Sequence, residues 1–178
     1  MAGSIAGVWA FLLTLLFVLK NAGMRLLKGI VMGKVTTIKG NLFDAPEGSI
    51  IIHACNTKGV WGSGIAREFA KRFPKARDIY AQTCQEQGPS LIGKCLLIPA
   101  GSHVIGCLFT SKNYGQFVDS PAKILTATRL AIAHLILQNE SKLPMHMCKI
   151  NAGLFNVPWP KTKAILKDAD VEFVVYDF

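Results

Sequence analysis

A buried strand, a glycine-rich loop and a helix follow one another in the first half of the chain, and this order constrains the fold more than any other feature. Residues 50–52 form a continuous apolar run, which is typical of a strand buried on both faces. Residues 59–64 contain three glycines, and Ile65, Phe69 and Phe73 then recur at helical spacing. Such a loop lets backbone N–H groups converge on an anion where the helix begins, although a tight turn with packing glycines is the alternative.

Strands and helices alternate along the rest of the chain, without repeats or low-complexity linkers. Besides residues 50–52, the expected strands cover residues 34–39, 94–98, 104–109, 145–150 and 171–176. The expected helices begin near Ile65, Pro74, Pro121 and Trp159. This alternation predicts one α/β domain over residues 33–178, with helices on both faces of a central sheet.

The first 32 residues differ in composition from this domain. Residues 1–19 carry no charge, and three basic residues follow them, Lys20, Arg25 and Lys28. A secretory signal fits poorly, because its positive charge should precede the apolar run. If the segment inserts into a membrane as an anchor, its basic flank should stay cytoplasmic and leave the domain on the cytosolic side.

The alternative is that residues 1–32 are not part of the native protein, since Met24 and Met32 are both plausible starts. Both interpretations of the N-terminus predict a cytoplasmic domain, which can also have access to the nucleus.

The five cysteines include no pair at C-x-x-C spacing, which favours reduced, buried thiols.

Charge and ligand patterning exclude several classes of partner. The formal net charge is +9, but the basic residues are scattered and do not alternate with aromatic residues as in a single-strand binder. No histidines flank the cysteines at the spacing of a zinc site. We therefore expect no nucleic-acid partner, no metal and no cofactor. The basic charge that remains suits an anionic metabolite, or simply keeps the domain soluble.

Loops with unusual chemistry follow three of the expected strands, at the strand ends where ligands bind in α/β sheets. In the first loop, Gly40-Asn41-Leu42, the Asn41 amide offers a donor and an acceptor to a base edge, although a simple turn is the alternative. The second loop covers residues 53–66.

The second loop begins with two polar side chains, His53 and Asn56, whose unpaired burial would be costly. A lone histidine is usually structural, but this one lies beside a loop suited to anions. In the third loop, residues 150–159, Gly153 permits a second anion nest and Phe155 can pack on a ribose or a base. The alternative is that its aromatic residues belong to the core, which we expect of Trp159.

Together the three loops resemble the signature of the macrodomain family, and the resemblance covers residues 33–178. Asn41 stands where an adenine-contacting Asp is expected in that family. His53 and Asn56 stand at the first and last positions of an Asn-Ala-Ala-Asn stretch that orients the distal ribose. Residues 62–66 and 151–155 match the two loops that grip the diphosphate.

Histidine at position 53 departs from the common macrodomain pattern. In this respect the chain is similar to a small fungal branch of the family, whose members remove the 1″-phosphate from ADP-ribose 1″-phosphate, a by-product of tRNA splicing. Those proteins share the Cys-Asn-x-x-Gly-x-Trp-Gly-x-Gly-Ile-Ala run found here at residues 55–66. The resemblance therefore implies a phosphatase. A non-catalytic ADP-ribose reader and a hydrolase of mono-ADP-ribosyl protein are the alternatives.

The resemblance also implies a three-layer α/β/α fold with a central mixed sheet, and we expect a monomer. It makes His53 a general acid or a group that orients water, and Asn56 the group that fixes the ribose hydroxyls. Cys55 as a covalent nucleophile is a competing mechanism, but no Cys-x5-Arg loop follows it. The implied ligand contacts are Gly40, Asn41, Leu42, Ala54, Cys55, Asn56, Trp61, Gly62, Ser63, Gly64, Ile65, Ala66, Asn151, Ala152, Gly153, Leu154, Phe155, Asn156 and Val157.

Overall fold

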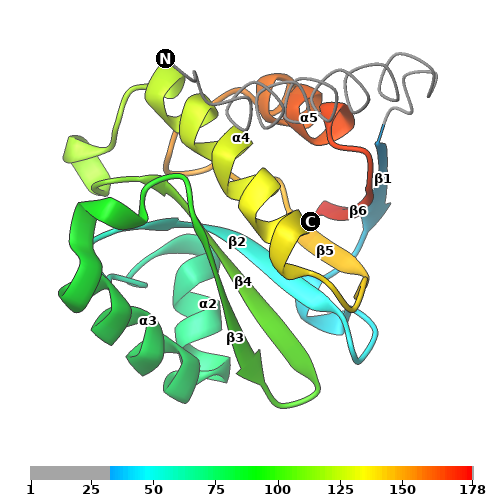
Figure 1. Ribbon diagram of the computed structural model, residues 1–178, viewed down its shortest axis with the longest axis horizontal. Coiled ribbons are helices and arrows are strands. Elements are labelled where there is room, and N and C mark those ends of the chain that lie inside the picture. Colours follow the sequence, from blue (N-terminus) through cyan, green and yellow to red (C-terminus); the bar gives the residue numbers. More distant parts are fainter. Residues whose placement is uncertain (1–32, 178) are drawn as a thin grey trace, which may run out of the picture. The chain divides into compact units, whose positions relative to one another are not determined.

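A six-stranded sheet runs through the middle of the protein in the computed structural model, which describes residues 33–177 (Figure 1). The spatial order is β1-β6-β5-β2-β4-β3, and every neighbouring pair is parallel except β3 and β4, which are antiparallel. The strands are β1 (Lys34–Lys39), β2 (Ile50–Asn56), β3 (Cys95–Ala100), β4 (His103–Ser111), β5 (Met145–Cys148) and β6 (Glu172–Asp177). The predicted mixed sheet is confirmed.

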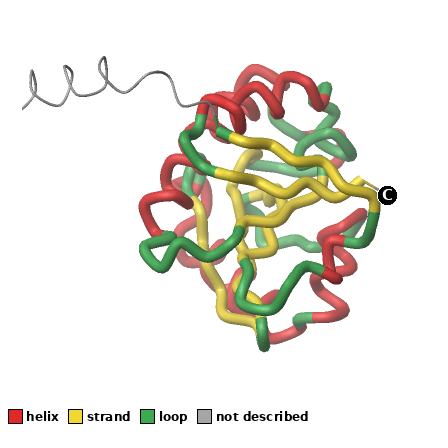
Figure 2. Tube along the Cα trace, turned by 90° about the vertical axis from the view of Figure 1, so that its right-hand side faces the viewer, coloured by secondary structure: helices red, strands yellow, loops and turns green. Residues whose placement is uncertain are grey.

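Helices cover both faces of this sheet, so the predicted α/β/α layering is confirmed (Figures 1 and 2). The helices are α2 (Gly64–Arg72), α3 (Pro74–Gln87), α4 (Pro121–Gln138) and α5 (Trp159–Asp168), with short 3-10 turns at Leu42–Asp44, Gly88–Leu91 and Gly115–Phe117. Proline occupies one of the first two positions of α3, α4 and α5, where its missing N–H costs no helical hydrogen bond. Helices α2 and α3 pack on one face, and α4 and α5 pack on the other.

Alternating side chains of β2 supply both halves of the core. Ile51 packs with Phe69 and Tyr80 in the layer of α2 and α3. Ile50 and Ile52 pack on the opposite face, against α4 and α5. All three isoleucines are fully buried, as the continuous apolar run predicted.

Strand β2 continues past residue 52, where the sequence pattern placed the start of a loop. Pairing with β4 extends from Ile50 to Asn56, and His53 lies opposite Cys107. The strand accommodates a polar residue there because the His53 ring stacks on Phe69, with ring centroids 4.2 Å apart. His53 therefore lies inside the sheet layer and not in the loop.

The predictions about residues 1–32 lie outside the described part of the chain. Within residues 33–177, no helix combines the length and apolar character that crossing a membrane requires.

Candidate functional site

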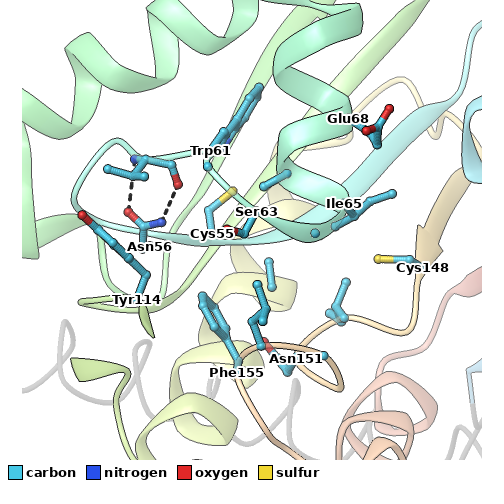
Figure 3. Close-up of a pocket in the computed structure, with 18 of the residues that line it drawn as sticks. Cys55, Asn56, Trp61, Ser63, Ile65, Glu68, Tyr114, Cys148, Asn151 and Phe155 are labelled. Carbon is cyan, nitrogen blue, oxygen red and sulfur yellow. Dashed lines mark hydrogen bonds between the residues drawn. The ribbon is translucent and has the colours of Figure 1, made fainter. Parts of the chain in front are cut away.

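A cavity of about 810 Å³ opens at the carboxyl ends of the central parallel strands (Figure 3). The β2–α2 loop and the start of α2 form one wall, and the β5–α5 loop forms the facing wall. Tyr114 and Gly115, from the β4–α4 connection, also line the cavity. This is the edge of an α/β sheet at which ligands bind.

The structure brings most of the predicted contacts together in this cavity. Those that line it are Ala54, Cys55, Asn56, Trp61, Gly62, Ser63, Gly64, Ile65, Ala66, Asn151, Gly153, Leu154 and Phe155. The second and third predicted loops therefore face each other across one cavity, although they are about a hundred residues apart in the sequence.

Other predicted site residues are not among those that line the cavity: the implied contacts Gly40, Asn41, Leu42, Ala152, Asn156 and Val157, and the implied catalytic residue His53. The Asn41 side chain caps a 3-10 turn by accepting a hydrogen bond from the Phe43 N–H at 3.1 Å. Leu42 and Val157 are buried in the core. The first predicted loop thus forms a local turn outside the cavity, and its contact with a base edge stays a prediction.

Some lining residues were not predicted from the sequence: Val60, Glu68, Tyr114, Gly115, Cys148, Lys149 and Ile150. Tyr114 reaches the cavity because β4 lies beside β2 and ends at the same edge of the sheet. Glu68 lies one turn inside α2, and its hydrogen bond with Lys71 lowers the pKa of the carboxyl group. Lys149 forms an ion pair with Asp177 at 2.6 Å. Strand order, which the sequence pattern did not give, is the information that would have found Tyr114.

The start of α2 presents free donors at the cavity wall. Ser63 is the N-cap residue but makes no side-chain capping bond. The first N–H groups of an α-helix have no partner within the helix, so those of Gly64, Ile65 and Ala66 are available to a ligand. Gly64 has a positive φ of 55°, a conformation that other residues rarely adopt.

The facing loop is held in place by Asn151. This residue has a positive φ of 63°, and its side chain accepts a hydrogen bond from Thr110 and donates one to Thr128, both at 2.9 Å. Among the described residues, the N–H groups of Leu154 and Phe155 have no acceptor. The two walls of the cavity therefore both carry unpaired N–H groups, which suit an anion between them.

The side chain of Asn56 forms its hydrogen bonds with the loop that precedes α2. Its amide donates to the Val60 carbonyl at 2.7 Å, and its Oδ1 accepts from the N–H groups of Lys58 and Val60 at 2.9 and 3.3 Å. The Tyr80 hydroxyl also donates to the Asn56 carbonyl at 2.6 Å. Asn56 lines the cavity, but its hydrogen bonds fix the shape of the wall.

Replacing Asn56 by Ala is expected to lower the free energy of unfolding by about 1–3 kcal/mol, because buried backbone groups lose their partners. ADP-ribose affinity should fall as well, since this loop positions the first N–H groups of α2 at the cavity. Asn139→Ala is the matched control: Asn139 makes the same kind of bonds to Leu143, both at 2.9 Å, outside the cavity. Thermal unfolding measures the stability of both variants, and calorimetry measures their affinity for ADP-ribose. An equal loss of affinity in the two variants would contradict this role of Asn56.

His53 lies behind the cavity wall and is fully buried. Its ring lies between Phe69 and Trp61, and Cys55 Sγ is 3.5 Å from its Nε2. Burial raises the pKa of the Cys55 thiol, but a hydrogen bond from Cys107 and the electrostatic effect of His53 outweigh burial and bring the pKa to about 6. Cys95 and Cys107 are buried free thiols, as predicted.

Comparison with known proteins assigns the chain to a family. Residues 52–166 match the model of the Macro domain. An ADP-ribose 1″-phosphate phosphatase of Chaetomium globosum is 40% identical over 153 residues, which cover 75% of this chain and 83% of that protein. The protein of the same name from Candida glabrata is 36% identical, over 82% of this chain and 99% of its own.

A solved structure, the macrodomain of Mycobacterium tuberculosis DarG, has the same fold with a TM-score of 0.67 and 23% identity. It covers 82% of this chain, and the match extends over 99% of that protein. Together with the cavity formed by the second and third predicted loops, these findings confirm the resemblance inferred from the sequence. The chain belongs to the macrodomain family.

Proposed function

We propose that this macrodomain removes the 1″-phosphate from ADP-ribose 1″-phosphate, giving ADP-ribose and inorganic phosphate. The observation that carries the proposal is the pair of facing walls with unpaired N–H groups, at Gly64–Ala66 and at Leu154 and Phe155. Fungal relatives that bear the name of this activity align along most of the chain.

The diphosphate would lie between these walls. The N–H groups of Gly64, Ile65 and Ala66 lie at the N-terminus of α2. This end of the helix dipole is positive, so it attracts phosphate oxygens. Leu154 and Phe155 supply N–H groups from the opposite side, and the partly exposed Phe155 ring can pack on a ribose. Backbone groups bind the anion in this scheme, so the site needs no lysine or arginine directed at the phosphates.

Hydrolysis forms a bond from a water oxygen to phosphorus and breaks the bond from phosphorus to the ribose 1″-oxygen, which takes up one of the protons of that water. Phosphoryl transfer depends mainly on positioning and on stabilising charge on the phosphoryl oxygens. We assign that work to the N–H groups of the two walls. Asn56 and His53 act as positioning residues in this proposal, because Asn56 holds the loop and His53 packs behind Cys55.

The deciding test measures phosphate release from ADP-ribose 1″-phosphate by the full chain, with ADP-ribose identified as the second product. ADP-ribose binding without phosphate release would make the protein a reader. Release of ADP-ribose from mono-ADP-ribosyl protein, with no action on the phosphorylated nucleotide, would make it the alternative hydrolase. Either result would overturn the proposed activity.

The N-terminal segment is expected to be dispensable for binding, because the three loops that carry the family resemblance all lie within residues 33–178. Calorimetry with ADP-ribose on the full chain and on residues 33–178 should give the same affinity. An affinity loss of more than about tenfold on truncation would contradict this expectation.

The biological setting is part of the same proposal. A substrate that arises in tRNA splicing, a domain in the cytoplasm and nucleus, a monomeric state and the absence of a nucleic-acid partner all follow from the sequence interpretation and the family resemblance. The scattered basic residues support the last of these. Gel filtration and fractionation of cells that express the full chain would test the state and the location.

A further inference from the structure

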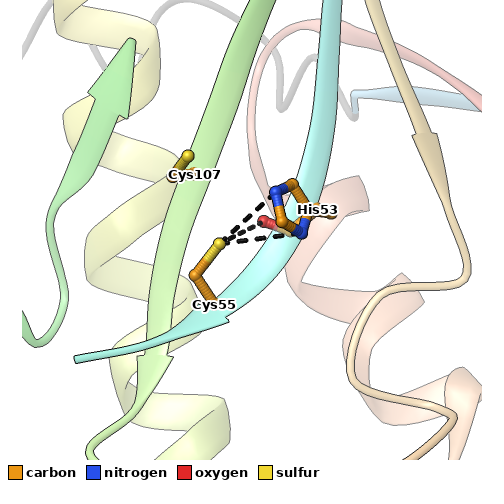
Figure 4. Close-up of side chains that lie close together, drawn as sticks. All are labelled: His53, Cys55 and Cys107. Atoms are coloured by element: carbon orange, nitrogen blue, oxygen red, sulfur yellow. Dashed lines mark hydrogen bonds between the residues drawn. The ribbon is translucent and has the colours of Figure 1, made fainter. Parts of the chain in front are cut away.

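Three side chains with soft donor atoms meet behind the cavity wall, on the face of the sheet that α2 and α3 cover (Figure 4). His53 and Cys55 come from β2, and Cys107 comes from the adjacent β4, directly opposite His53. Their donor atoms all lie within 4.8 Å of one another. The residues are 0%, 2% and 0% exposed. Two cysteines and one histidine thus converge in a buried place, where only Cys55 borders the cavity.

The distance between Cys55 and His53 is close to the distance between two ligand atoms of one metal ion. Zinc binds thiolate sulfur at about 2.3 Å and imidazole nitrogen at about 2.0–2.1 Å, so a tetrahedral angle places the two ligand atoms about 3.6 Å apart. In the structure Cys55 Sγ lies 3.5 Å from Nε2 and 3.6 Å from Nδ1 of His53. Because Sγ is nearly equidistant from the two nitrogens, it lies over the face of the imidazole. A rotation of the ring about its Cβ–Cγ bond, together with a shift of Cys107, would aim all three donors at one point.

The surroundings suit a soft ion and not a hard one. The cluster contains no carboxylate, and oxygen ligands are what magnesium and calcium require. Phe69 stacks on the histidine ring, and Trp61 contacts it edge-on at 4.8 Å between centroids. Among the described residues the buried Trp61 Nε1 has no hydrogen-bond partner. Its N–H can therefore donate a hydrogen bond to a thiolate sulfur of the cluster, although it cannot bind the ion itself. Cys55 also lines the cavity, which provides a path for entry.

We propose that His53, Cys55 and Cys107 form a binding site for a thiophilic d10 ion, Zn²⁺ or Cu⁺. Each coordinating thiol gives up its proton to solvent when the ion binds, and the histidine binds in its neutral form. Three protein ligands leave a fourth position open, as in zinc sites that are not purely structural. The site lies outside the phosphate-binding walls, so the inference goes beyond the proposed function. It revises the expectation of no metal, which rested on sequence spacing alone.

The test is a titration of the reduced, chelator-treated full chain with Zn²⁺, and separately with Cu⁺ under anaerobic conditions, against a chromophoric competitor. The expected result is one ion per chain for at least one of the two metals. Cys107→Ser should weaken that binding by about 100-fold or more, because a ligand is lost. Cys95→Ser is the matched control, since Cys95 is also a buried thiol but lies on the other face of the sheet. The metal affinity of this variant should match that of the wild type.

His53→Phe is the second variant, because it preserves the aromatic packing but lacks a ligand nitrogen, and it should also weaken binding. The proposal is overturned if neither metal binds stoichiometrically, or if the Cys107 and Cys95 variants bind equally well in folded proteins. These measurements use no nucleotide. A protein that binds the ion but releases no phosphate would therefore reject the proposed function and leave the metal site standing.

Discussion

Replacing Gly64 by Val is expected to lower the affinity for ADP-ribose by about 100-fold, which corresponds to about 2.7 kcal/mol. Gly64 is the first residue of α2, with φ at 55°, and valine is strained at that angle. A Cβ at this position would project toward Leu154 of the facing wall, 3.7 Å from its Cδ1. The new side chain would therefore enter the space between the two sets of N–H groups, and relief of the strain would turn those groups away.

Gly101→Val is the matched control for this variant. Gly101 has a similar φ of 65°, but it lies in the turn between β3 and β4 and does not line the cavity. Both variants should lose stability to a similar extent, and only Gly64→Val should lose affinity. Calorimetry with ADP-ribose, together with thermal unfolding, separates the two effects. Wild-type affinity in a folded Gly64→Val protein would mean that the glycine-rich loop is only a turn.

The periodicity of apolar residues was sufficient to predict most of the strands and helices. Each expected strand and helix exists, and the largest error in a strand boundary is at β2, which ends at Asn56 and not at Ile52. The apolar run marked only the part of β2 with aliphatic side chains on both faces. The strand continues because His53 finds an aromatic partner in Phe69, which comes from a helix later in the chain. Such a tertiary contact leaves no signal within the run itself.

The cavity was predictable to the extent that its residues lie in glycine-containing loops. Gly64 and Gly153 both line the cavity, one on each wall, because a wall whose backbone faces a ligand favours residues without a side chain. Tyr114 was not predicted, because its loop carries no such mark and its place depends on β4 lying beside β2. Cys107 joins His53 and Cys55 through the same strand pairing, so spacing rules for metal ligands within one segment could not find that cluster.

The position of His53 leads to the last prediction, which separates a chemical role from a packing role. The ring is fully buried and does not line the cavity, so it reaches a bound phosphate only through Cys55 or after rearrangement. His53→Ala should remove the stack on Phe69, leave a cavity behind Cys55 and lower the free energy of unfolding by about 3 kcal/mol. The loosened wall should slow phosphate release by about 100-fold or more, which is also the scale of a lost general acid.

His53→Phe tells these two causes apart, because it keeps an aromatic ring against Phe69 and Trp61 but carries no titratable group. If His53 positions the wall, the Phe variant should release phosphate within about tenfold of the wild-type rate, while the Ala variant stays about 100-fold slower. Both are compared after treatment with a chelator, so that loss of a bound ion is not counted as loss of catalysis. An equally slow, correctly folded Phe variant would show that the imidazole nitrogens take part in the reaction. His53 would then act as a general acid or orient the attacking water, as the family resemblance implies.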